Sequence, residues 1–149
     1  MSQSLPLVVV TGPPEAAEVA LALADQLGCA LVSLGQIEAE LAEHAEDTPR
    51  AWVRDDAESE VVRRLAAFDG VAVLDAAVEP PPQPERVAAL VRTWSDHVVE
   101  VKCIWPGHDR ESVGAGRTVV LDASRPVTPG DLASVVRRET GTRRGVRRH

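Results

Sequence analysis

The 149-residue sequence is poor in aromatic residues and in lysine. It contains no tyrosine, one phenylalanine and three tryptophans, and Lys102 is its only lysine beside fifteen arginines. A core with so few rings must be built mainly from alanine, valine and leucine, and such small side chains favour close packing of helices on a sheet. No apolar run approaches the about 20 residues that cross a membrane, and the N-terminus lacks the basic flank of a signal peptide. We therefore expect a cytoplasmic protein that does not contact membranes.

Cysteine and histidine are also scarce. Cys29 and Cys103 have neither the CxxC spacing nor a nearby histidine that would indicate a metal site or a redox pair. None of the four histidines belongs to a cluster with acids at metal-ligand spacing. The sequence therefore predicts two buried free thiols and no bound metal.

Charge is distributed unevenly along the chain. The net charge is −7, but residues 137–149 contain six arginines and one glutamate, so the rest of the chain is strongly acidic. The segment from Glu139 onward has too few apolar residues to form a core. We expect a folded domain over residues 1–138 and a disordered basic tail over 139–149. Opposite charges on the two parts would also allow self-association into a homodimer.

Short apolar runs, which are typical of buried strands, alternate along the domain with segments whose apolar residues recur every three to four positions, as in a helix. The helix expected after residue 48 has Thr48 as its N-cap, with Trp52 and Val61 among the residues that face the core. Five such alternations imply right-handed crossovers and an α/β fold, a three-layer α/β/α sandwich around a five-stranded parallel sheet. The expected strands are 7–10, 30–34, 71–74, 98–104 and 117–121, and the expected helices are 16–27, 36–46, 49–68, 84–94 and one from 129.

The first strand and helix have the layout of a phosphate-binding loop. The apolar run 7–10 precedes Gly12, Pro13 and Pro14, and a helical stripe follows. In the pattern G-x-x-x-x-G-K-[ST], backbone N–H groups cradle phosphates, the lysine reaches the outer oxygens and the hydroxyl binds Mg²⁺. Counting from Gly12, the last three positions of that pattern are Ala17, Glu18 and Val19, and none of these side chains can perform the required role.

This segment resembles the P-loop of small bacterial ATP-binding kinases of the AAA-like, polynucleotide-kinase and zeta-toxin type. The resemblance continues over residues 29–41, 71–78 and 99–103. It implies the strand order 2-3-1-4-5 and an acid of the Walker B type at Asp75. It also implies that the arginine-bearing helix expected after the fourth strand is missing, which leaves Arg110 and Arg117 as candidate anion contacts. The vestigial nucleotide-binding residues that it implies are Gly12, Pro13, Pro14, Ala17, Glu18, Val19 and Asp75.

Several of these positions have a simpler interpretation. Asp75 could instead cap a helix or lie in solvent at the end of a strand, and each arginine could be a surface charge. Gln36 stands near the end of the second strand, where such kinases usually have an acid, and glutamine cannot accept a proton. Glu18 reverses the charge of the missing lysine, and each unit pair at 4 Å contributes about 4 kcal/mol at an effective dielectric of about 20. Nucleotide binding is therefore disfavoured at this loop.

Three functions remain open from the sequence. The favoured hypothesis is a catalytically inactive P-loop kinase-like pseudoenzyme, without catalytic residues or a cofactor, that acts as a regulatory or protein-interaction module with an unidentified protein partner. The second is a residual nucleotide-binding protein or weak ATP-dependent small-molecule kinase, which would need ATP and Mg²⁺. The third is a nucleic-acid-associated protein that uses the arginine-rich tail. Outside that tail the acidic domain would repel nucleic acid.

Overall fold

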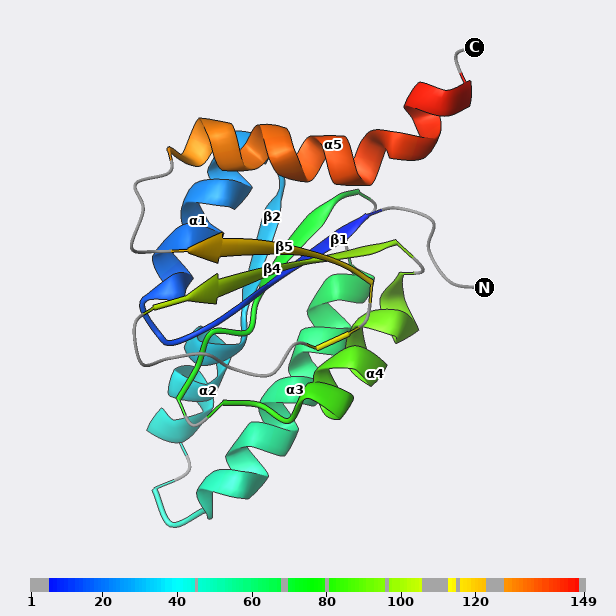
Figure 1. Cartoon of the computed structure of the whole chain (residues 1–149). Helices are drawn as coiled ribbons and strands as arrows, with labels where there is room; N and C mark the ends of the chain where they lie inside the picture. Colours follow the sequence, from blue (N-terminus) through cyan, green and yellow to red (C-terminus); the bar gives the residue numbers. More distant parts are fainter. Residues whose placement is uncertain are drawn as a thin grey trace.

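The computed structural model of the chain is built on a single parallel sheet (Figure 1). It describes residues 6–44, 46–67, 70–79, 81–95, 97–105, 113–114, 116–122 and 128–147, with side chains up to residue 139. The sheet has the order β2-β3-β1-β4-β5, and every neighbouring pair is parallel. The predicted fold class and strand order are confirmed. The strands are β1 (Leu7–Thr11), β2 (Ala30–Ser33), β3 (Ala72–Asp75), β4 (Val98–Ile104) and β5 (Arg117–Asp122).

Helices cover both faces of this sheet. Helices α1 (Ala16–Leu27) and α5 (Pro129–Arg147) lie on one face, and α2 (Leu34–Glu43), α3 (Arg50–Ala66) and α4 (Pro84–Trp94) lie on the other (Figure 1). The alternation of side chains along β1 divides the core accordingly, because successive residues of a strand point to opposite faces. Val8 and Val10 pack with α1 and α5, whereas Leu7 and Val9 pack with the other three helices.

The start of α3 differs from the prediction. Its N-cap is Pro49, and no side chain caps it, so the expected cap by Thr48 is wrong. Trp52, expected to face the core, is 64% exposed. The buried stripe is instead formed by Val53, Ala57, Val61 and Leu65, at the spacing of three to four residues that keeps side chains on one helix face.

Helix α5 begins as predicted and extends further than expected. The backbone N–H of Asp131 donates a 3.1 Å hydrogen bond to Thr128 Oγ1, which caps the start of the helix. Leu132, Ala133 and Val136 are buried against the sheet. The helix continues through residue 138 to Arg147, so helical backbone crosses the expected boundary of the tail. The division into a domain and a disordered tail stays a prediction.

The two cysteines lie in the core or next to it. Both are free thiols, as predicted, and Cys103 is buried, whereas Cys29 is half-buried rather than buried. Burial raises the pKa of Cys103 to about 12, so its thiol is unreactive at neutral pH. In the part of the chain that the structure describes, no group of three or more ligating side chains could hold a metal. The helices within those ranges include none that is long and apolar enough to cross a bilayer.

Candidate functional site

The turn that connects β1 to α1 is packed tightly against β4. Gly12 has a φ of 142°, a conformation that side chains rarely allow. A Cβ atom at this position would lie 2.7 Å from the carbonyl oxygen of Cys103. Glycine is therefore required here by packing within the protein, whether or not a ligand binds.

Several backbone N–H groups of this turn are absent or are used within the turn itself. Pro13 and Pro14 have no N–H group. The N–H groups of Ala16, Ala17 and Glu18 donate to the carbonyl oxygens three residues earlier, at 2.8, 3.0 and 3.2 Å. Helix α1 begins at Ala16, one residue before the position where the phosphate-binding pattern has its second glycine. The turn is therefore wound into a helix at the place where a phosphate would need free N–H groups.

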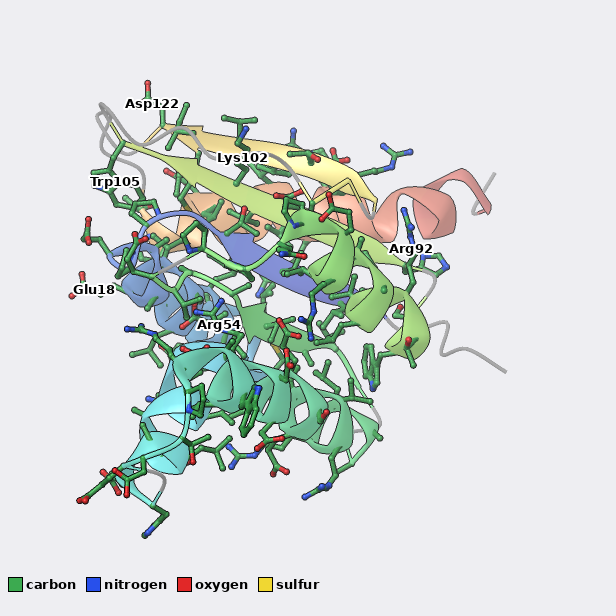
Figure 2. The ribbon with its side chains drawn as sticks, turned by 90° about the horizontal axis from the view of Figure 1, so that it is seen from below. Glu18, Arg54, Arg92, Lys102, Trp105 and Asp122 are labelled. Carbon is green, nitrogen blue, oxygen red and sulfur yellow. The ribbon has the colours of Figure 1, made fainter. Side chains whose placement is uncertain are left out.

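The acidic side chains of this turn do not substitute for a phosphate. Glu15 occupies the N-cap position but makes no side-chain cap hydrogen bond, and Glu18 is exposed in the first helical turn (Figure 2). The N–H groups of the turn donate to backbone carbonyls rather than to these carboxylates. Glu18 and Val19 line a small cleft of about 190 Å³ against β5 and α5. The only lysine, Lys102, lies on β4, away from Glu18 (Figure 2).

Asp75 is buried at the carboxyl end of β3, with 3% of its surface exposed. Its Oδ1 accepts a 2.9 Å hydrogen bond from the N–H of Ala77, and its Oδ2 accepts a 3.0 Å bond from the hydroxyl of Ser33. Burial raises the pKa of the Asp75 carboxyl group, and these two hydrogen bonds oppose that rise. The next helix begins only at Pro84, so the interpretation of Asp75 as a helix cap or a solvated residue is wrong.

Ser33, rather than Gln36, is the partner of Asp75. Strand β2 ends at Ser33, which lies beside Asp75 in the parallel register. Its hydroxyl oxygen also accepts a 3.2 Å hydrogen bond from the N–H of Gln36 and so caps α2. Sequence reasoning missed this pair, although both residues end neighbouring strands. The ends of adjacent parallel strands meet at one edge of a sheet, so that position was the available signal.

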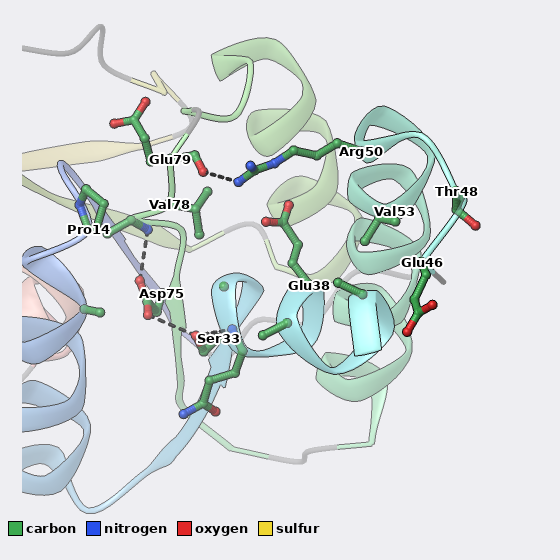
Figure 3. A pocket seen from close by; sticks show the side chains of 16 residues that line it. Pro14, Ser33, Glu38, Glu46, Thr48, Arg50, Val53, Asp75, Val78 and Glu79 are labelled. Atoms are coloured by element: carbon green, nitrogen blue, oxygen red, sulfur yellow. Dashed lines mark hydrogen bonds between the residues drawn. The ribbon is translucent and has the colours of Figure 1, made fainter. Parts of the chain in front are cut away.

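A pocket of about 780 Å³ opens beside Asp75 (Figure 3). Pro14 and Ala17 of the turn border it on one side, and α2, the start of α3 and the segment after β3 form its other walls. Three of the residues that the resemblance assigns to a nucleotide site, namely Pro14, Ala17 and Asp75, therefore lie together at this pocket. A volume of this size is typical of a small-molecule site.

An ion pair forms part of the wall between α2 and α3. Arg54 contacts Glu38, and only 13% and 14% of their side chains are exposed. Burial lowers the pKa of Arg54, an effect that the nearby carboxylate of Glu58 opposes. Arg86 of α4 donates to two acids of α3, namely Asp55 at 2.8 Å and Glu58 at 2.6 Å. The first pair joins α2 to α3 in the wall of the pocket, and the contacts of Arg86 join α3 to α4 beside a separate cleft.

A second buried acid, Glu100, was also missed. It lies on β4 with 0% of its surface exposed and accepts a 2.9 Å hydrogen bond from Thr11 Oγ1, at the end of β1. Its carboxylate also accepts hydrogen bonds from the N–H groups of Val113, at 3.0 Å, and Gly114, at 3.4 Å. Glu100 thus joins the segment before β5 to the end of β1. A single acid inside a valine-rich strand was the signal in the sequence.

Of the two arginines proposed as anion contacts, Arg117 is described and does not join this site. Arg117 is the first residue of β5, whereas Asp75 lies at the carboxyl end of β3. Because all strands are parallel, the two residues lie at opposite ends of the strands. Its guanidinium pairs with Glu139 at 3.2 Å. Arg110 lies outside the described residues.

Neither the comparison with known protein families nor the comparison with curated protein sequences gives a match. Solved structures do resemble this chain. A kinase structure from Chloroflexus aurantiacus has a TM-score of 0.72 at 14% identity and covers 92% of this chain and 99% of its own. A gluconokinase from Sinorhizobium meliloti has a TM-score of 0.60 at 15% identity and covers 94% of this chain and 91% of its own. These similarities show that the chain has a kinase-like α/β fold.

Proposed function

We propose that this protein is a kinase-fold pseudoenzyme that does not transfer phosphate from ATP and instead acts as a regulatory binding module. The observation that supports this most strongly is the closed turn between β1 and α1. Two prolines lack N–H groups there, and three further N–H groups donate to backbone carbonyls within the turn. Phosphoryl transfer depends on positioning and on neutralising phosphate charge, and this turn supplies neither.

The side chains of the turn support the same proposal. Glu18 brings a negative charge to the position of the phosphate-binding lysine, and Val19 has no oxygen to bind Mg²⁺. We infer that the protein uses no ATP and no metal cofactor. The pocket beside Asp75 is the part of the site that remains large enough to bind a small molecule. Occupation of that pocket would alter the surface of α2 and α3, where a protein partner could respond to it.

Calorimetric titration with ATP and Mg²⁺ tests the proposal. We expect no binding by the wild type at micromolar concentrations and no ATP consumption with gluconate as acceptor, chosen because one structural neighbour is a gluconokinase. The Glu18→Lys/Val19→Ser variant should gain only weak affinity for ATP, because it restores the charge and the hydroxyl of the pattern but leaves the N–H groups of the turn bonded to carbonyls. Glu43→Lys is the matched control for charge, since Glu43 is exposed on α2 and does not border the pocket. Micromolar ATP binding by the wild type would contradict the proposal.

A further inference from the structure

The wall of the pocket beside Asp75 is acidic. Four carboxylates and one guanidinium border it, so their formal net charge is −3. The guanidinium belongs to Arg50 and donates a 2.6 Å hydrogen bond to the carbonyl oxygen of Glu79. An anionic ligand would meet repulsion here. The carboxylates are those of Glu38, Glu46, Asp75 and Glu79.

Asp75 is the acid whose charge most needs compensation. Its two printed hydrogen bonds come from a backbone amide and a serine hydroxyl, which are both neutral donors. Among the described residues, no arginine, lysine or histidine forms an ion pair with it, whereas Glu38 is paired with Arg54. A buried carboxylate without a cation is unfavourable, and a cationic group of a ligand at this position would relieve that cost.

The acids are spread along the pocket rather than gathered at one point. Asp75 lies at one end of the view in Figure 3, Glu46 lies at the other, and Glu38 lies between them. The described side chains form no cluster that could hold a metal ion, so one compact ion could not contact these acids together. The surface between them is largely apolar and includes Ala39 and Val53. An elongated molecule with separated cationic groups matches this arrangement.

We propose that the pocket binds a linear organic polycation of the polyamine class. One ammonium group would lie at Asp75, the methylene chain would pass over the alanine and valine side chains, and a second ammonium group would reach toward Glu46. This inference rests on the proposed function, because it identifies the ligand class of the same pocket. It concerns binding only and requires no chemical step.

Calorimetric titration of the whole chain with spermidine tests this inference, with 1,8-octanediol as the neutral probe and gluconate as the anionic probe. We expect spermidine to bind and the other two not to bind. Asp75→Asn should weaken spermidine binding about tenfold, which corresponds to about 1.4 kcal/mol, and Glu46→Gln should weaken it about threefold. Glu43→Gln, an exposed acid of α2 that does not border the pocket, should leave the affinity unchanged.

A second variant leaves the buried carboxylate of Asp75 unchanged. Ala39→Lys adds a cation on an exposed helical position that borders the pocket, so it should abolish spermidine binding without affecting folding. Equal losses in Asp75→Asn and Glu43→Gln would indicate diffuse attraction to an acidic surface and would overturn the inference. Displacement of spermidine by an equal concentration of Mg²⁺, or tighter binding of gluconate, would overturn it as well. ATP binding by the wild type would contradict the proposed function but not this inference.

Discussion

The turn between β1 and α1 and the pocket beside it share Pro14 and Ala17 as a border, yet they differ in their polar groups. In the turn, the N–H groups of Ala16, Ala17 and Glu18 donate to neighbouring carbonyls, and the Glu18 side chain is exposed. In the pocket, a buried acid, a serine hydroxyl and an ion pair surround a volume of about 780 Å³. The proposed function rests on this difference, because the turn is held by its own backbone hydrogen bonds whereas the pocket has room for a small molecule.

The largest expected effect comes from the glycines of the two regions. Gly12→Ala should lower the free energy of unfolding by about 3 kcal/mol, because the new Cβ would lie 2.7 Å from a backbone oxygen at a positive φ. Gly35→Ala, on the pocket side, should change it by less than about 1 kcal/mol, because its Cβ would meet side-chain atoms of Val78 at 3.1 Å and Ser33 at 3.9 Å, and helix propensity improves. Urea denaturation measures both. Equal losses would show that the turn is no more constrained than the pocket.

The ion pair in the pocket wall should have the next largest effect. Arg54→Ala leaves Glu38 half-buried without its partner and should lower the free energy of unfolding by about 2 kcal/mol. The Glu38→Gln/Arg54→Met variant removes both charges and should recover most of that loss. Arg63→Ala is the control, since 78% of that side chain is exposed, and should change stability by less than about 0.5 kcal/mol. A double variant no more stable than Arg54→Ala would contradict the importance of charge in this wall.

Asp75→Asn separates the effect of charge from that of shape in the pocket. Burial raises the pKa of Asp75 above its ordinary value of 3.8, so the native state binds its proton more tightly than the unfolded state. The wild type should therefore gain stability relative to Asp75→Asn as the pH falls from 7 toward 4. Denaturation midpoints of both proteins at several pH values measure this difference. A relative loss of wild-type stability in acid would mean that the folded-state pKa is lowered instead.

The smallest expected effect is at the position of the missing lysine. Glu18→Lys replaces an acid in the first turn of α1 with a base and should lower the free energy of unfolding by about 0.5 kcal/mol, because negative charge is favoured at a helix N-terminus. The free energy of unfolding of Glu18→Gln should lie between those of the wild type and Glu18→Lys. Thermal denaturation at low ionic strength gives the difference, and 0.5 M salt should reduce it. A more stable Glu18→Lys variant would show that the turn still favours a cation.

Most of the scaffold could be predicted because its signals are local. The bounds of β4 and α1 and the start of α4 at Pro84 match the expectation, since apolar runs, helical periodicity and a proline at the first helical position mark them directly. The start of α3 was less predictable. Thr48 and Pro49 have the composition of a cap and first turn, but the chain places Trp52 outward, because Val53 and Ala57 fit the core.

The candidate site was less predictable than the scaffold, because its partners are distant in the sequence. That Ala17, Glu18 and Val19 do not match the phosphate-binding pattern counted from Gly12 could be read directly from the sequence. The bond between Ser33 and Asp75 joins residues 42 positions apart, and the bond between Thr11 and Glu100 joins residues 89 positions apart. No local pattern contains both members of such a pair, so only the packed sheet could reveal them.

The sequence by itself determined the alternation of strands and helices and the absence of a lysine and a hydroxyl from the phosphate-binding pattern, since both are properties of neighbouring residues. Tertiary structure alone decided that Asp75 is buried, that Arg117 lies at the far edge of the sheet and that the acids of α2 and β3 border one pocket. Burial and proximity depend on which strands become neighbours, and the free energy of that choice is distributed over the whole core.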